Sequence, residues 1–101
     1  MDTIFALASA QGKAGVAVIR ISGPSAHAVA GRLSGDLPAQ GTTLRVLRTD
    51  TGLPLDEALV LSFAAPRSFT GEDVVEFQIH GSIAVIASVL NELGSQPDAR
   101  L

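Results

Sequence analysis

The sequence predicts an α+β fold, a two-layer sandwich in which two main helices pack on a mainly antiparallel or mixed sheet of about five strands. Strand-like runs separated by turns are interrupted by only two helical patterns. The composition is that of a folded protein, since 47% of the residues are hydrophobic and only 17% are charged. Residues 1–101 are enough for one small domain, and neither a linker nor an internal repeat divides them.

Two strands and a helix are expected in the first third of the chain. The strands cover Thr3–Ser9 and Val16–Ile21, and the glycine-containing loop Ala10–Gly15 joins them. Pro24 suits the first turn of a helix, and apolar residues then repeat at helical spacing until Gly35 ends the helix. We expect the loop to pack near a ligand or a second subunit.

The rest of the chain predicts a hairpin, one more strand and a second helix. Leu44–Arg48 and Glu57–Phe63 read as strands joined by the turn at residues 50–54. After the next strand, Ser82 caps a helix with one apolar stripe, and Gly94 ends it at a position that suits the permissive backbone of glycine. The predicted order is ββαβββα.

Charge and hydropathy exclude several classes of function. The net charge is −3, the seven cationic residues are scattered, and four phenylalanines are the whole aromatic content, so this domain alone is not expected to grip nucleic acid. The apolar stretches are far shorter than the ~20 residues that cross a bilayer. No secretory signal is present at the start of the sequence, so we expect a cytoplasmic protein without a membrane partner.

The common catalytic and metal-binding motifs are not present. Gly12-Lys13 lacks the remaining residues of a phosphate-binding loop, because Leu7 and Ala14 occupy the positions of the first glycine and the Ser or Thr. No serine lies in a Gly-x-Ser-x-Gly sequence, and there is no cysteine. His27 and His80 are too far apart in sequence for a local metal site, and His27 is interpreted as a solvated helix residue. We therefore expect no catalytic residue and no metal ligand within these residues.

Arg20 and Glu76 are the candidate site residues. Arg20 shares one face of its strand with Val16 and Val18, where a charge needs a partner. Glu76 lies in the middle of the alternating strand Val74–His80, on the polar face that also carries Gln78 and His80. One interpretation is a structural ion pair, or simply a solvated sheet face. The other is a ligand site, in which a carboxylate accepts hydrogen bonds from a planar heterocycle and a guanidinium binds an anion.

Several short segments together resemble the start of the MnmE/TrmE family of tRNA-modification GTPases. The most specific is Ser68–Asp73, with the sequence Ser-Phe-Thr-Gly-Glu-Asp, and the similarity covers essentially the whole chain. The other matching segments are Asp2-Thr3-Ile4, Val18–Pro24, Ala65–Glu76 and His80-Gly81.

This resemblance implies the N-terminal domain of a cytoplasmic GTPase that modifies the wobble uridine of tRNA with the FAD-dependent protein MnmG. Such a domain forms a homodimer, resembles the folate-binding domain of aminomethyltransferases, and binds a one-carbon tetrahydrofolate, usually represented by 5-formyl-tetrahydrofolate. GTP, Mg²⁺ and K⁺ would be bound by a GTPase domain outside these 101 residues.

By position in the matching segments, Arg20 and Glu76 correspond to the family's folate contacts. The resemblance implies that Glu76 accepts from the pterin ring N–H and amino group, while Arg20 pairs with an anionic or carbonyl part of the ligand. A third contact, a lysine, would lie beyond Leu101. Two glycine positions of the family differ here, as Ala14 and Ser82, which affects how closely the backbone approaches a ligand.

Three functions are therefore compared. The first is a folate-binding and dimerisation module of a tRNA-modifying GTPase. The second is a purely structural dimerisation domain without a competent ligand site, and the third is a stand-alone folate enzyme of the aminomethyltransferase kind. The third is the weakest, because it needs a larger protein and a catalytic acid that cannot be placed in this sequence.

Overall fold

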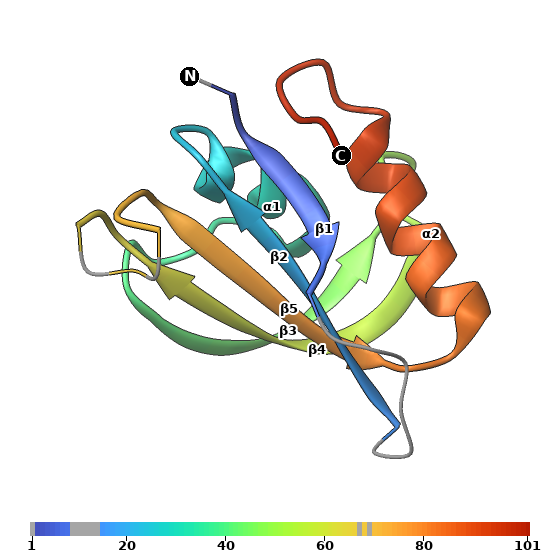
Figure 1. The fold of residues 1–101 in the computed structure, drawn as a ribbon. Helices are drawn as coiled ribbons and strands as arrows, with labels where there is room; N and C mark the ends of the chain where they lie inside the picture. Colours follow the sequence, from blue (N-terminus) through green and yellow to red (C-terminus); the bar gives the residue numbers. More distant parts are fainter. Residues whose placement is uncertain (1, 9–14, 67, 69) are drawn as a thin grey trace.

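The fold is an α+β domain with one five-stranded sheet and two helices, as the sequence predicts (Figure 1). The computed structural model describes residues 2–8, 15–66, 68 and 70–101. The sheet has the order β1-β2-β5-β4-β3, and all four pairings of these strands are antiparallel. The elements are β1 (Ile4–Leu7), β2 (Val16–Ser22), α1 (Ala26–Ser34), β3 (Gly41–Arg48), β4 (Pro54–Phe63), β5 (Val74–His80) and α2 (Ile83–Gly94).

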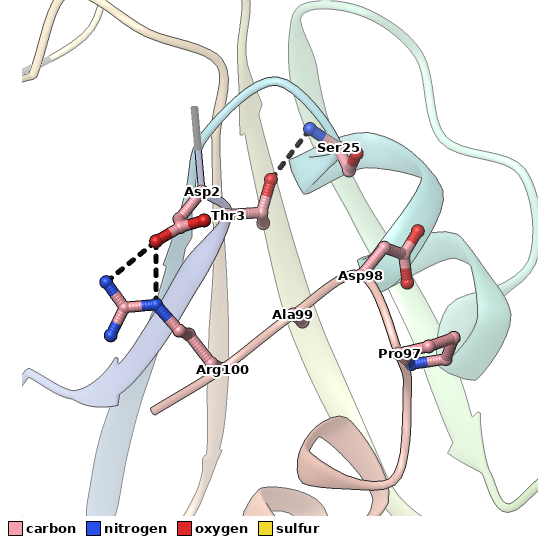
Figure 2. A pocket seen from close by; sticks show the side chains of 7 residues that line it. All are labelled: Asp2, Thr3, Ser25, Pro97, Asp98, Ala99 and Arg100. Atoms are coloured by element: carbon pink, nitrogen blue, oxygen red, sulfur yellow. Dashed lines mark hydrogen bonds and ion pairs between the residues drawn. The ribbon is translucent and has the colours of Figure 1, made fainter.

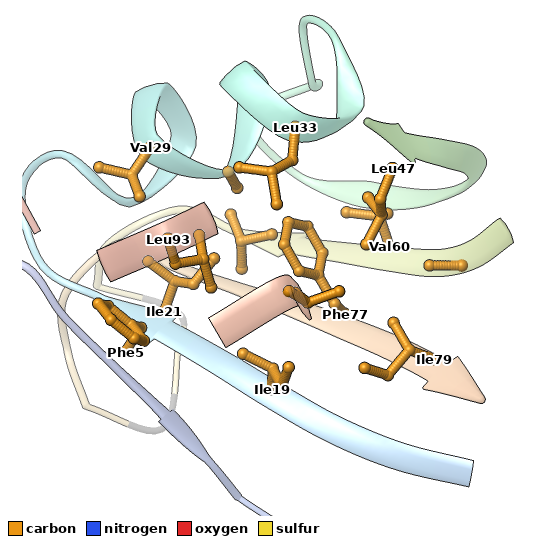
Figure 3. Close-up of a cluster of buried hydrophobic side chains, with 14 of the residues drawn as sticks. Phe5, Ile19, Ile21, Val29, Leu33, Leu47, Val60, Phe77, Ile79 and Leu93 are labelled. Atoms are coloured by element: carbon orange, nitrogen blue, oxygen red, sulfur yellow. The ribbon is translucent and has the colours of Figure 1, made fainter. Parts of the chain in front are cut away.

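Both helices pack on the same face of the sheet and form a two-layer structure. Val29 and Leu33 of α1 and Leu93 of α2 belong to the buried cluster that also contains Ile19 and Phe77 of the sheet (Figure 3). All five side chains are no more than 3% exposed. Because successive side chains of a strand point to opposite faces, the residues between these core positions lie on a face that neither helix covers.

The start of α1 differs from the prediction. The helix begins at Ala26, with Ser25 as its N-cap residue, so Pro24 precedes the helix instead of lying in its first turn. The Ser25 N–H donates to Thr3 Oγ1 at 2.8 Å, which satisfies one of the free donors at this end of the helix. Gly35 ends α1 as predicted, with a φ of 83° and its N–H bonded to the Gly31 carbonyl.

The second helix confirms one cap and corrects the other. Ser82 Oγ accepts from the Val85 N–H at 3.1 Å, the N-cap bond that the sequence predicts. Gly94 is the last residue of α2 but is not among the glycines with positive φ. Its permissive backbone is therefore not what ends the helix, and Ser95 continues the turn with its N–H bonded to the carbonyls of Asn91 and Glu92.

The predicted hairpin is present, whereas the first predicted strand is shorter than expected. β3 and β4 are antiparallel neighbours joined by a turn in which the Gly52 N–H bonds to the Thr49 carbonyl at 3.0 Å. β1 ends at Leu7, and the expected end at Ser9 lies outside the described residues. The predicted ligand-facing loop also lies outside them, apart from Gly15, whose carbonyl accepts from the Gly81 N–H.

The two ends of the chain lie side by side and are bonded to each other (Figure 2). Arg100 pairs with β1 in a parallel bridge, because the Phe5 N–H donates to the Arg100 carbonyl and the Arg100 N–H donates to the Thr3 carbonyl. Asp2 and Arg100 form an ion pair at 2.8 Å. These groups line a cavity of about 240 Å³. Since the polar groups drawn in Figure 2 bond largely to one another, we interpret this cavity as a structural network.

A second ion pair holds the C-terminal segment against α1. The Arg32 guanidinium donates to both carboxylate oxygens of Asp98, at 2.6 and 2.9 Å. The hydrogen bond from Arg32 lowers the pKa of the Asp98 carboxyl below its ordinary value. Of the two helices in the described residues, neither is long and apolar enough to cross a bilayer.

Two glycine substitutions should change stability in opposite directions. Gly23 has a φ of 140°, and a Cβ there would lie 2.5 Å from the Thr3 Cα, so Gly23→Ala should lower the free energy of unfolding. The expected loss is about 1–3 kcal/mol, the usual cost of overpacking. A Cβ on Gly31, inside α1, meets open space, so Gly31→Ala should raise the free energy of unfolding by about 0.5–1 kcal/mol. Denaturant unfolding of both variants tests this, and equal midpoints would contradict the backbone argument.

The Arg32–Asp98 pair makes a prediction about pH. In Arg32→Gln the pKa of Asp98 should rise towards its ordinary value, which an NMR titration of the carboxyl carbons can measure. The pKa is lowered in the folded state, so the contribution of the pair is present above the unfolded pKa of about 3.9 and is lost as the pH falls through the folded pKa. Arg45→Gln is the control, because Arg45 bonds to the Ser34 carbonyl instead of a carboxylate. An Asp98 titration unchanged by Arg32→Gln would refute this assignment.

Candidate functional site

The two predicted site residues lie opposite each other on the uncovered face of the sheet. Glu76 is on the central strand β5, and Arg20 is on its neighbour β2. β2 and β5 pair antiparallel, and their register places Arg20 directly across from Glu76. On the other face of the same strands, Ile19 lies across from Phe77 and both are fully buried in the core. The packing of the core therefore fixes the position of the charged pair.

Arg20 and Glu76 form the ion pair that one sequence interpretation predicts. Nε and Nη2 of Arg20 donate to Glu76 Oε1 at 2.9 and 2.7 Å. Glu76 is only 7% exposed, whereas the Arg20 side chain is 37% exposed. A carboxylate this deeply buried needs a cationic partner, because an isolated buried charge is very costly.

This pairing leaves part of the Glu76 carboxylate available. Both bonds from Arg20 go to Oε1, and among the residues that the structure describes no donor is bonded to Oε2. A side-on pair of this kind differs from the fork in which a guanidinium binds both oxygens. An ionised carboxylate has about four lone-pair sites, so Glu76 can accept further hydrogen bonds without losing Arg20.

Exposed apolar side chains surround the pair on the uncovered face. They come from strands on both sides of Arg20 and Glu76, and Leu44 is 63% exposed. The alternation of the strands places them all on this face. The set, called the apolar patch below, is Ile4, Val16, Leu44, Val46 and Leu59. Large exposed apolar side chains that share one face of a folded domain suit a site for a ligand or another protein.

The Ser-Phe-Thr-Gly-Glu-Asp segment is hydrogen-bonded to the sheet near the Arg20–Glu76 pair. Thr70 Oγ1 lies 3.0 Å from Ser22 Oγ at the end of β2, and the Asp73 carbonyl accepts from the Gly23 N–H at 3.0 Å. Asp73 Oδ1 also accepts from the Ala65 N–H. The segment is thus bonded to the end of β2 two residues after Arg20. Arg67 and Phe69 lie outside the described residues.

A second polar pair, Asp56 with His80, was not identified as a pair from the sequence. His80 Nδ1 lies 2.7 Å from Asp56 Oδ1, and the His80 backbone N–H donates to Asp56 Oδ2 at 2.8 Å. The Asp56 side chain is 11% exposed and that of His80 is 72% exposed. His80 also lines a cavity of about 190 Å³, together with Val16, Glu57, Leu59, Gln78 and Ile79. An aspartate just after a turn was the only sequence signal for this pair.

His27 corrects the interpretation of a solvated helix residue. It is half-buried, its Nε2 lies 3.0 Å from the Ala39 carbonyl oxygen, and its Nδ1 lies 3.7 Å from Asp73 Oδ2. The side chain therefore links α1 to the loops that precede β3 and β5. In the part of the chain that the structure describes, no group of three or more His, Cys, Asp or Glu residues is arranged to hold a metal ion.

The comparisons with known proteins identify the family. Residues 3–101 match the family model described as "GTP-binding protein TrmE N-terminus". Two relatives named tRNA modification GTPase MnmE are similar over the whole chain, at 61% identity in Roseobacter denitrificans and 62% in Dinoroseobacter shibae. A Homo sapiens relative, "5-taurinomethyluridine-[tRNA] synthase subunit GTPB3, mitochondrial", is 55% identical over 97% of the chain.

The chain matches only a part of each relative, 24% of the two bacterial proteins and 21% of the human protein. The matching part is the one that the family model names as the N-terminus. With a match over residues 3–101 and identities above half, the chain belongs to the TrmE N-terminal family, the N-terminal domain of the tRNA modification GTPases MnmE.

Proposed function

We propose that this domain binds a one-carbon tetrahydrofolate, represented by 5-formyl-tetrahydrofolate, on the uncovered face of its sheet. The observation that carries the proposal is the state of Glu76, a buried carboxylate in mid-strand with one oxygen held by Arg20 and the other without a described donor. A pterin presents a ring N–H and an amino group side by side. Such a pair of donors fits the two oxygens of a carboxylate.

Arg20 has a positioning role in this proposal and a second role towards the ligand. Its two bonds to Oε1 hold the carboxylate in one orientation and offset the cost of burying its charge. The Arg20 side chain is 37% exposed, so the guanidinium lies at the surface where a carbonyl or anionic group of the ligand can approach it. The structure contains the ion pair of the first interpretation, and its geometry would also allow the ligand site of the second.

At the level of the whole protein, we place the domain in a GTPase that modifies the wobble uridine of tRNA in the cytoplasm. The names of the bacterial relatives support tRNA modification and GTPase activity in this placement. The domain would supply the one-carbon ligand and self-association, while GTP, Mg²⁺ and K⁺ would be bound by another domain. The human relative's name describes that protein as a subunit of a tRNA-modifying synthase, which supports a partner protein, and we propose that this partner is a flavoprotein of the MnmG kind.

Glu76→Gln should weaken the binding of 5-formyl-tetrahydrofolate. The change preserves side-chain size but replaces an acceptor with an amide donor that faces the donors of the pterin, so we expect a loss of roughly tenfold or more in affinity. Isothermal titration calorimetry measures it. Glu92→Gln is the matched control, since it makes the same chemical change on α2 in the opposite layer. Arg20→Gln should also weaken binding, because the carboxylate loses the group that orients it.

Saturable binding that persists in Glu76→Gln would mean that the ligand binds elsewhere on the domain. If the unsubstituted chain bound no folate but still self-associated, the alternative of a purely structural dimerisation domain would take precedence. Each variant is first compared with the parent by circular dichroism and denaturant unfolding. A loss of affinity without a loss of structure then reports on the site itself.

We further propose that the domain forms a homodimer through the apolar patch. Five large aliphatic side chains on the uncovered face are between 37% and 63% exposed. Their removal from water would provide the driving force for association, since aliphatic side chains contribute in proportion to the apolar area that they bury. The same surface lies around Arg20 and Glu76, so a second copy would also limit the access of water to the ligand.

A double substitution in the apolar patch should abolish self-association. Leu44→Lys with Leu59→Lys places two charges on the uncovered face and should yield a monomer by analytical ultracentrifugation at concentrations where the parent is a dimer. Leu53→Lys is the control, because Leu53 is similarly exposed, at 65%, but lies in the turn between β3 and β4. Equal sedimentation of the double variant and the parent dimer would exclude this surface.

A further inference from the structure

We propose that His80, held by Asp56, forms a second subsite of the same ligand site and binds a carboxylate at the far end of the ligand. The inference rests on the proposed function, because it concerns the tail of a folate whose pterin is bound at Glu76. It assigns a binding role to His80 at the C-terminal end of β5 and to Asp56 near the start of β4, and neither residue takes part in the ion pair with Arg20. The ligand chemistry is a carboxylate carried on an elongated aromatic molecule.

The contacts of His80 determine which of its nitrogens faces outward. The Asp56 carboxylate only accepts hydrogen bonds when ionised, so Nδ1, which lies 2.7 Å from Oδ1, must carry the hydrogen. The other oxygen of Asp56 holds the His80 backbone N–H at 2.8 Å, which fixes the residue from two sides. Nε2 is then the nitrogen left for a ligand, and the side chain is 72% exposed. When Nε2 is protonated, it donates a charge-assisted hydrogen bond to an anion.

The position of His80 along the strand suits the length of a folate. Glu76, Gln78 and His80 lie on the uncovered face of β5, and four residues of a strand span about 13 Å. A one-carbon folate is elongated, with the pterin at one end, an aromatic ring in the middle and glutamate carboxylates at the other end. A ligand whose pterin contacts Glu76 and which lies along β5 therefore directs its carboxylates towards His80.

The surface between Glu76 and His80 suits the aromatic middle part of a folate. A cavity of about 190 Å³ lies beside His80, and its lining combines the apolar side chains of Val16 and Leu59 with the amide of Gln78. Aliphatic side chains provide a contact surface for an aromatic ring, and an amide side chain both donates and accepts hydrogen bonds. The cavity thus extends the site in the direction that the strand geometry indicates.

Acidic side chains lie beside His80. In the described residues, β4 contributes Asp56 and Glu57, whereas β2 begins here with Val16 and the first turn of α2 carries no charged side chain. Asp56 is occupied by His80, but Glu57 is exposed and would repel an anionic ligand. The hydrogen bond from His80 must therefore outweigh this repulsion, and removal of the Glu57 charge should strengthen binding.

The experiment is a calorimetric titration of the chain and of His80→Asn with 5-formyl-tetrahydrofolate. His80→Asn should bind roughly three- to tenfold more weakly. An asparagine keeps a donor for Asp56 but cannot present the imidazole Nε2 to the ligand, and an unfolding midpoint equal to that of the parent shows that the fold is intact.

Two further titrations make the test specific. With the amide of 5-formyl-tetrahydropteroate, which has neither the glutamate nor a terminal carboxylate, the parent and His80→Asn should bind equally well. Glu57→Gln is the matched control on the neighbouring strand, and it should bind the complete folate more tightly because a repulsive charge is removed.

Unchanged affinity in His80→Asn, together with loss of binding in Glu76→Gln, would overturn the second subsite and leave the folate site in place. Equal weakening of the complete and the glutamate-free ligand would also overturn it, because His80 would then act on the shape of the site instead of on the carboxylate. Absence of binding to the parent would overturn both the folate site and the subsite.

Discussion

The antiparallel pairing of β2 with β5 is the constraint on which the rest of the structure depends. Its register places Ile19 against Phe77 in the core and Arg20 against Glu76 on the uncovered face. Because side chains alternate, a shift of one residue in either strand would exchange the core positions for the charged ones. The free energy gained by burying the core therefore also holds the candidate site in place.

The Arg20–Glu76 pair is difficult to explain by stability alone. Burying a carboxylate to 7% exposure costs solvation that a partly exposed guanidinium does not always repay, and apolar residues often replace such pairs without loss. The neighbours on this face, including Val16 and Leu59, are already apolar and exposed. A stable sheet could have used the same residue types at positions 20 and 76. The proposed ligand site would account for charged residues at these two positions.

Local patterns in the sequence predicted the helices, the strands and the Arg20–Glu76 pair. They could not predict other contacts between segments that are far apart in the chain. Alternation in Val74–His80 and the turn before β4 predicted the sheet, and the same alternation placed Glu76 on its polar face. The start of α1 was misplaced because Thr3, 22 residues away, holds the Ser25 N–H. The Asp56–His80 pair was missed for the same reason, because it joins two distant segments. By alternation Asp56 is on the core side of β4, and it contacts His80 at the end of β5.

The uncovered face of β5 also has a direction. Along the strand, Glu76 is an acid paired with a cation, Gln78 is neutral, and His80 is a base held by an acid. The two ends therefore differ in the hydrogen bonds that they offer, with a carboxylate acceptor at one end and an imidazole nitrogen at the other. A molecule with paired donors at one end and carboxylates at the other satisfies both ends in one orientation only, because the reverse orientation brings its carboxylates against Glu76. The order of side chains on a single strand would thus be sufficient to orient the proposed ligand.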